Sequence, residues 1–100
     1  MSGFDTVHNY HEDAVFRAVI ESAVHHPWAS GQPDLLADVA CVALNRLPPR
    51  YVRHDLDTQF YMGDEARMRL EAAIKTAVDY AFGFVKSKTV PPSPTAAKDG

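Results

Sequence analysis

The chain has 100 residues, a net charge of −3 and a hydrophobic fraction of 46%. This length makes one small domain, and the hydrophobic fraction predicts that most of it folds. The slight acidic excess disfavours a general DNA- or RNA-binding protein, which usually carries a basic surplus. The single cysteine excludes an internal disulfide and fits a reducing compartment. With no signal sequence and no apolar run of about 18 residues, we expect a cytoplasmic protein without a membrane span.

The first predicted element is an amphipathic helix that follows a short lead, residues 1–8, which we expect to be flexible. Asn9 and Glu12 have the spacing of a capping box, so we expect Asn9 to cap this helix. Pro27 ends it. Its apolar stripe has helical spacing and consists of Val15, Phe16, Val19, Ile20 and Ala23.

A second helix is predicted over residues 35–47, with Asp34 as its N-cap. Its end is well defined, because Pro48 and Pro49 cannot supply the backbone donors of a helix and disfavour helical geometry before them. This helix is apolar over most of its circumference, which indicates a central position or a dimer seam. We therefore expect a homodimer whose seam includes the flank that carries Val42.

A third helix is predicted to begin at Asp64, with apolar residues at helical spacing as far as Val85. Between residues 50 and 61 apolar and charged residues mix, which fits either an extended segment or a single helical turn. Prolines and small residues predict that residues 88–100 are a disordered tail. The sequence thus predicts an all-α fold of three main helices within a domain that spans residues 9–87.

Three arginines and one tyrosine surround the two-proline corner at the end of the second helix. They are Arg46, Arg50, Tyr51 and Arg53. Arginine forks bind phosphate oxygens or a guanine edge, and an aromatic ring stacks on a base. The corner therefore suits a ligand with phosphates and flat bases. The alternative is that these arginines are solvated surface charges that pair with nearby aspartates.

Histidines and catalytic motifs give weaker signals. His8 and His11 would share a helix face only if the helix began before Asn9, and the adjacent His25 and His26 point in different directions. Because zinc needs three or four ligands, we predict no metal site, although His11 can still contact a ligand. The chain has no glycine-rich phosphate loop, nucleophile elbow or zinc-protease motif, so we predict that it is not an enzyme.

The segment around the corner resembles the ComFB family, which is named for a late competence protein. Residues 38–39 read Asp-Val, residues 44–52 read Leu-Asn-Arg-Leu-Pro-Pro-Arg-Tyr-Val, and Asn9, Glu12 and Val15 resemble the start of the family's first helix. The resemblance covers roughly residues 7–85. It implies a small, mostly helical, dimeric bacterial domain, several members of which are receptors for cyclic dinucleotides, notably cyclic di-GMP.

One feature of the family is missing. Many members have a Cys-x-x-Cys pair just before the Asp-Val, which suggests a metal clip. Gln32 and Leu35 occupy the matching positions here, and Cys41 lies within the second helix, where we interpret it as a small core side chain. We therefore expect neither zinc nor another cofactor.

The resemblance makes the hypothesis specific. We expect a non-enzymatic receptor that binds a cyclic dinucleotide, cyclic di-GMP in preference to cyclic di-AMP, and relays it to an unidentified regulatory protein. Arginines would contact phosphates or guanine edges, tyrosines would stack, and aspartates would accept from guanine. The expected ligand-binding residues are Arg50, Tyr51, Arg46, Asn45, Arg53, Pro49, Tyr10, His11, Asp55 and Asp57. The alternative is a dimeric protein-interaction adaptor without a small-molecule ligand.

Overall fold

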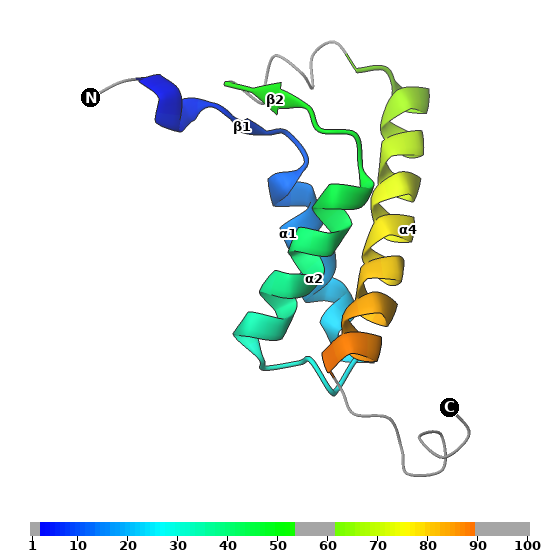
Figure 1. The fold of residues 1–100 in the computed structure, drawn as a ribbon. Coiled ribbons are helices and arrows are strands. Elements are labelled where there is room, and N and C mark those ends of the chain that lie inside the picture. Colours follow the sequence, from blue (N-terminus) through cyan, green and yellow to red (C-terminus); the bar gives the residue numbers. More distant parts are fainter. Residues whose placement is uncertain (1–2, 54–61, 90–100) are drawn as a thin grey trace.

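The computed structural model describes residues 3–53 and 62–89, and three helices packed together make up most of this part (Figure 1). A small antiparallel ribbon of two short strands is added to the helices that the sequence predicts. The elements in chain order are η1 (Gly3–Thr6), β1 (His8–Asn9), α1 (Glu12–Ser22), η2 (Ala23–His25), α2 (Pro33–Arg46), β2 (Tyr51–Val52) and α4 (Asp64–Thr89), where η marks a 3-10 helix.

α4 is the longest element and packs against both α2 and α1 (Figure 1). Its buried residues have the predicted helical spacing, and Phe82 is its largest fully buried side chain. Small residues of α2 allow the helices to approach closely. The buried residues of these two helices are Val39, Ala40, Ala43, Ile74, Ala77, Val78, Ala81, Phe82 and Val85. Within the two described ranges, no helix combines the length and hydrophobicity that a membrane span requires.

The start of α1 differs from the predicted one. The helix begins at Glu12 with His11 in the N-cap position, and no side chain caps it. Asn9 lies in β1 instead, because its side chain binds two backbone groups outside the helix. The predicted capping box is therefore wrong.

The start of α2 is also shifted, whereas its end at Arg46 lies one residue before the predicted one. The helix begins at Pro33, and Gln32 rather than Asp34 is its N-cap residue. Proline suits the first helical position, because its fixed φ is helical and a backbone N–H there would have no helical partner. At the other end Leu47 is already extended, with φ −103° and ψ 143°.

Both ends of the domain reach further than predicted. The lead that we expected to be flexible contains η1 and, at His8, the first residue of β1. α4 continues to Thr89, two residues beyond the predicted boundary. Residues 90–100, most of the predicted tail, lie outside the described part of the chain.

Candidate functional site

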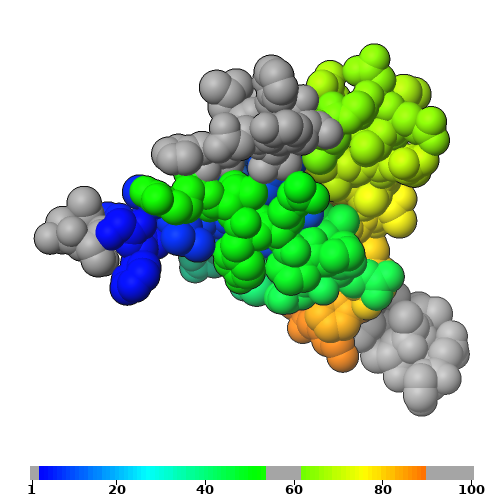
Figure 2. All heavy atoms as spheres, turned by 90° about the horizontal axis from the view of Figure 1, so that it is seen from above, coloured from blue at the N-terminus to red at the C-terminus, as the bar shows by residue number. Residues whose placement is uncertain are grey.

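The segment that follows the two prolines is an extended strand, held by the N-terminal ribbon. β1 pairs with β2 in antiparallel register, with Asn9 opposite Tyr51. Beyond the ribbon, the backbone N–H of Tyr10 donates to the carbonyl of Arg50 at 2.5 Å. Figure 2 looks onto this end of the molecule and shows the blue N-terminal arm beside the green segment that carries β2. The residues that follow the two prolines are thus held in place by backbone hydrogen bonds to the N-terminal segment.

Asn9 is the buried polar anchor of this arrangement. Its Oδ1 accepts the backbone N–H of His11 and that of Arg50, each at 3.2 Å. The first bond forms an Asx turn that leads into α1, and the second joins residues 41 positions apart. One amide oxygen therefore fixes both the start of α1 and the strand after the corner.

His11 holds the corner itself. The residue is 6% exposed, and its Nε2 lies 3.1 Å from the carbonyl oxygen of Pro48. Because a carbonyl only accepts, Nε2 carries the proton and the ring is a donor in this bond. The structure thus gives His11 a positioning role at the corner, and its expected contact with a ligand stays a prediction.

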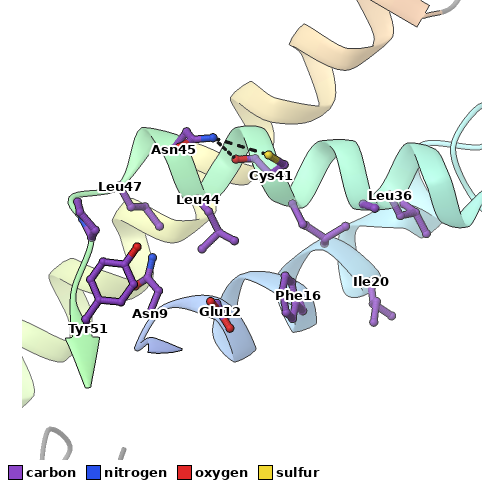
Figure 3. A pocket seen from close by; sticks show the side chains of 14 residues that line it. Asn9, Glu12, Phe16, Ile20, Leu36, Cys41, Leu44, Asn45, Leu47 and Tyr51 are labelled. Atoms are coloured by element: carbon purple, nitrogen blue, oxygen red, sulfur yellow. Dashed lines mark hydrogen bonds between the residues drawn. The ribbon is translucent and has the colours of Figure 1, made fainter. Parts of the chain in front are cut away.

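An open apolar groove of about 770 Å³ runs between α1 and α2 and ends at the corner (Figure 3). Phe16 and Ile20 line it from α1, and Leu36 and Leu44 line it from α2. Tyr51 lies at the end near Asn9 (Figure 3). A groove of this size and composition suits an apolar or aromatic group.

Three of the expected ligand-binding residues line this groove together. They are Asn45, Pro49 and Tyr51. Tyr51 is 69% exposed, so its ring is available to a ligand. Asn45 is also exposed, and its Nδ2 donates to the carbonyl of Cys41 at 3.0 Å within its own helix. Cys41 is exposed on the same helix face, so the interpretation of this cysteine as a core side chain is wrong.

The three corner arginines point to different surroundings. The guanidinium carbon of Arg46 lies 4.0 Å from the centre of the Tyr80 ring on α4. The Nε of Arg53 donates to Thr6 Oγ1 at 3.0 Å, which ties β2 to η1. Arg50 is held through its backbone, and its side chain is exposed. The predicted cluster therefore separates into two arginines with intramolecular contacts and one directed to solvent.

The other expected residues lie apart from the groove or outside the described chain. Tyr10 and His11 line a second, more polar pocket of about 470 Å³ between α1 and α4, together with Arg17 and Arg67. Asp55 and Asp57 fall outside the described residues. No group of three metal-ligating side chains occurs within residues 3–53 and 62–89.

His26 carries the clearest electrostatic perturbation in the described chain, away from the groove. Its ring stacks on buried Phe82 with centroids 4.0 Å apart and planes 7° apart. Burial against this ring lowers the pKa of His26 below its ordinary value of 6.5, and the charge of His25 lowers it further. This histidine therefore packs as an aromatic side chain directly after η2.

Asn9 is the site residue that the sequence analysis misplaced. Its three-residue spacing to Glu12 fitted a local cap, and no sequence signal indicated a partner 41 positions away. The exposure of Phe16 was missed for a similar reason, because the stripe of α1 does not reveal which of its members a neighbour covers.

Comparison with known proteins identifies one family. The family described as late competence development protein ComFB matches residues 8–89, from the first residue of β1 to the last residue of α4. Neither the comparison with curated proteins nor that with solved structures finds a match.

Proposed function

The chain belongs to the ComFB family, and we propose that it is a non-enzymatic receptor that binds a cyclic dinucleotide, cyclic di-GMP in preference to cyclic di-AMP, and relays it to a partner protein. One observation carries the proposal beyond family membership. Arg50, just before β2, and Tyr51, the first residue of β2, are adjacent and exposed, and buried Asn9 accepts the backbone N–H of Arg50. A guanidinium group and an aromatic ring, which suit the phosphates and bases of such a ligand, are thus attached to a backbone that is held in place before the ligand binds.

Arg50 is the proposed contact to phosphate or to a guanine edge. A guanidinium fork binds two phosphate oxygens, or the O6 and N7 atoms of guanine, and adenine has no O6. Arg46 and Arg53 contact Tyr80 and Thr6, whereas within residues 3–53 and 62–89 the side chain of Arg50 has no such contact to break in order to reach a ligand. Because the strand is held before binding, little backbone entropy is lost when the ligand arrives.

Tyr51 is the proposed stacking platform. Stacking of a base on an aromatic side chain contributes about 1–3 kcal/mol per base. The ring lies where the groove meets β2 (Figure 3), and Pro49 and Asn45 also line this groove.

The second candidate is a protein-interaction adaptor without a small-molecule ligand. The observation that favours it is the open apolar groove, since apolar surface of this kind commonly marks a protein contact. Both candidates use the same end of the molecule, but only the receptor needs the guanidinium of Arg50.

A thermal-shift screen distinguishes the two candidates. The purified chain is heated with cyclic di-GMP, cyclic di-AMP or a linear dinucleotide, and the melting temperatures are compared. A ligand that binds only the folded state stabilises it by about 2.7 kcal/mol at a hundredfold excess over Kd. If the chain is a receptor, cyclic di-GMP should raise the melting temperature more than the other two ligands do. An unchanged melting temperature with all three ligands would leave the adaptor.

A further inference from the structure

Two exposed aromatic rings lie one turn apart on the carboxyl-terminal part of α4, which is orange in Figure 1. Tyr80 is 43% exposed and Phe84 is 40% exposed, and their ring centres are 6.0 Å apart with planes 21° apart. A cation lies over each ring. The guanidinium carbon of Arg46 lies 4.0 Å from the centre of Tyr80, and the Nζ of Lys88 lies 5.7 Å from the centre of Phe84. We call Arg46, Tyr80, Phe84 and Lys88 the α4 column.

The α4 column offers positive charge to a partner. An aromatic ring is negative over its faces and positive at its edge. The faces of Tyr80 and Phe84 attract the two cations, which leaves the positive ring edges for a partner. The N–H groups of a guanidinium lie in its own plane, so Arg46 can bind a carboxylate while that plane stacks on Tyr80. The column therefore favours an acidic partner.

The two cations of the column have no ion pair within residues 3–53 and 62–89. Other cations of α4 do pair with carboxylates of the same helix. These pairs are Arg67–Asp64, Arg69–Glu65 and Lys75–Asp79. The charges of Arg46 and Lys88 are thus left for carboxylates that come from another molecule.

Gly83 leaves a gap in the surface beside Phe84 and one turn from Tyr80. It is exposed in the interior of α4, and a side chain there would meet no described atom within 4 Å of its Cβ. Its φ is not positive, so the backbone conformation does not require glycine. Apart from proline, glycine is the least favourable residue in a helix interior. A partner that approaches the helix closely gives this glycine a reason that its own chain does not.

We propose that the α4 column is the docking surface for an acidic amphipathic helix of the partner protein. Apolar side chains of that helix lie over Tyr80, Phe84 and the gap at Gly83. Its carboxylates bind Arg46 at one end and Lys88 at the other. The inference rests on the contact with a partner protein in the proposed function, which the receptor and the adaptor share. The column residues do not line the groove, so a ligand at the groove and a partner at the column can be bound together.

A single-stranded nucleic acid fits the column less well than an acidic helix. Bases stack on free aromatic faces, whereas Tyr80 and Phe84 already stack on each other and carry cations over their faces. The net charge of −3 also repels a phosphate backbone. An acidic helix needs no free ring face.

Fluorescence anisotropy with a designed, labelled peptide tests the chemistry of the partner without cyclic di-GMP. The probe has about 16 residues, long enough to form a helix, with leucines along one face and glutamates beside them. We expect wild type to bind this peptide about tenfold more tightly than its lysine counterpart, because like charges repel. A labelled oligothymidine should also bind more weakly. No binding of the acidic peptide, or tighter binding of either competitor, overturns the proposal.

Matched charge reversals test whether the peptide binds at the column. Lys88→Glu reverses a column charge, and Lys86→Glu makes the same change on an exposed lysine of α4 outside the column. We expect Lys88→Glu to weaken peptide binding about tenfold and Lys86→Glu less than about threefold. Equal weakening by the two variants overturns the site. A changed mass of Lys88→Glu in light scattering, which would mark the column as a contact between copies, also overturns it.

Gly83→Gln separates docking from folding. Glutamine is a better helix former than glycine, so the melting temperature should rise, while its side chain fills the gap and should weaken peptide binding about fivefold. Peptide binding equal to that of wild type overturns docking at Gly83. Cyclic di-GMP titration of Lys88→Glu should match that of wild type, so a failure of the receptor function is observed separately from a failure of docking.

Discussion

Arg50 differs from the neighbouring arginines in what its side chain contacts. Arg46 stacks on Tyr80 and Arg53 bonds Thr6, so both are used within the chain. Within the described ranges 3–53 and 62–89, Arg50 is fixed through its backbone amide and carbonyl. At the scale of single residues, three arginines that are equivalent in the sequence pattern therefore differ in the contacts that their guanidinium groups make before a ligand binds.

Substitutions of Tyr51 test whether its ring stacks on a base. Tyr51→Phe keeps the ring and should bind cyclic di-GMP within about threefold of wild type, whereas Tyr51→Ala should lose about 1–3 kcal/mol of binding free energy. Calorimetric titration of each variant measures the difference. If Tyr51→Phe binds as weakly as Tyr51→Ala, the hydroxyl rather than the ring makes the contact.

The lowered pKa of His26 predicts a pH dependence of stability. Because the unfolded chain binds a proton more readily than the folded one, the contribution of His26 is complete above about pH 6.5 and is lost as the pH falls from there to its lower folded-state pKa. Melting temperatures of wild type and His26→Gln should therefore converge toward low pH. A difference in melting temperature that stays constant across this pH range would contradict a contribution from His26. Comparing the two proteins cancels the effect of the other histidines, because both contain them.

At the scale of elements, the periodicity of the sequence predicted the three helices and the end of α2. Prolines and apolar spacing act within a few residues, so they can be recognised in one sequence. The ribbon could not be predicted, because β1 and β2 have two residues each and depend on a contact between Asn9 and Arg50. The capping-box pattern predicted that Asn9 caps the first turn of α1, whereas its side chain accepts the backbone N–H of Arg50.

Asn9→Ala tests the anchor of this ribbon. The change leaves two backbone N–H groups without their acceptor, at about 1–3 kcal/mol for each one that stays buried. For a domain of this size we expect the melting temperature to fall by about 4–8 °C per kcal/mol. Asn45→Ala is the control, since the amide of exposed Asn45 bonds Cys41 within its own helix. Equal melting temperatures for the two variants would show that Asn9 does not hold the ribbon.

At the scale of the whole molecule, the sequence predicted the apolar stripes of the helices, but not which of their residues stay exposed when the helices pack. Helical spacing identified Phe16, Val19 and Ile20 as one stripe, and only the packing of α2 and α4 decides which of them is covered. Val42, which we expected on the flank of a dimer seam, is half buried and packs against the core of its own chain, and its place on a seam stays a prediction.

Removal of residues 90–100 tests the extent of the domain. The segment has several prolines and little apolar content, so it should contribute little to packing. We expect the shortened chain to keep the melting temperature and the cyclic di-GMP affinity of the full chain. A loss of several degrees would show that this segment docks on the domain.

The most direct measurement of the proposed function is calorimetric titration of cyclic di-GMP into wild type, Arg50→Ala and Arg69→Ala. Arg69 is the control, an exposed arginine of α4 that pairs with Glu65 at 2.6 Å. A contact to a charged ligand contributes about 1.5–3 kcal/mol, so Arg50→Ala should weaken binding at least tenfold. Arg69→Ala should bind like wild type. Unchanged binding by Arg50→Ala, at an unchanged melting temperature, would contradict the assignment of the ligand to this strand.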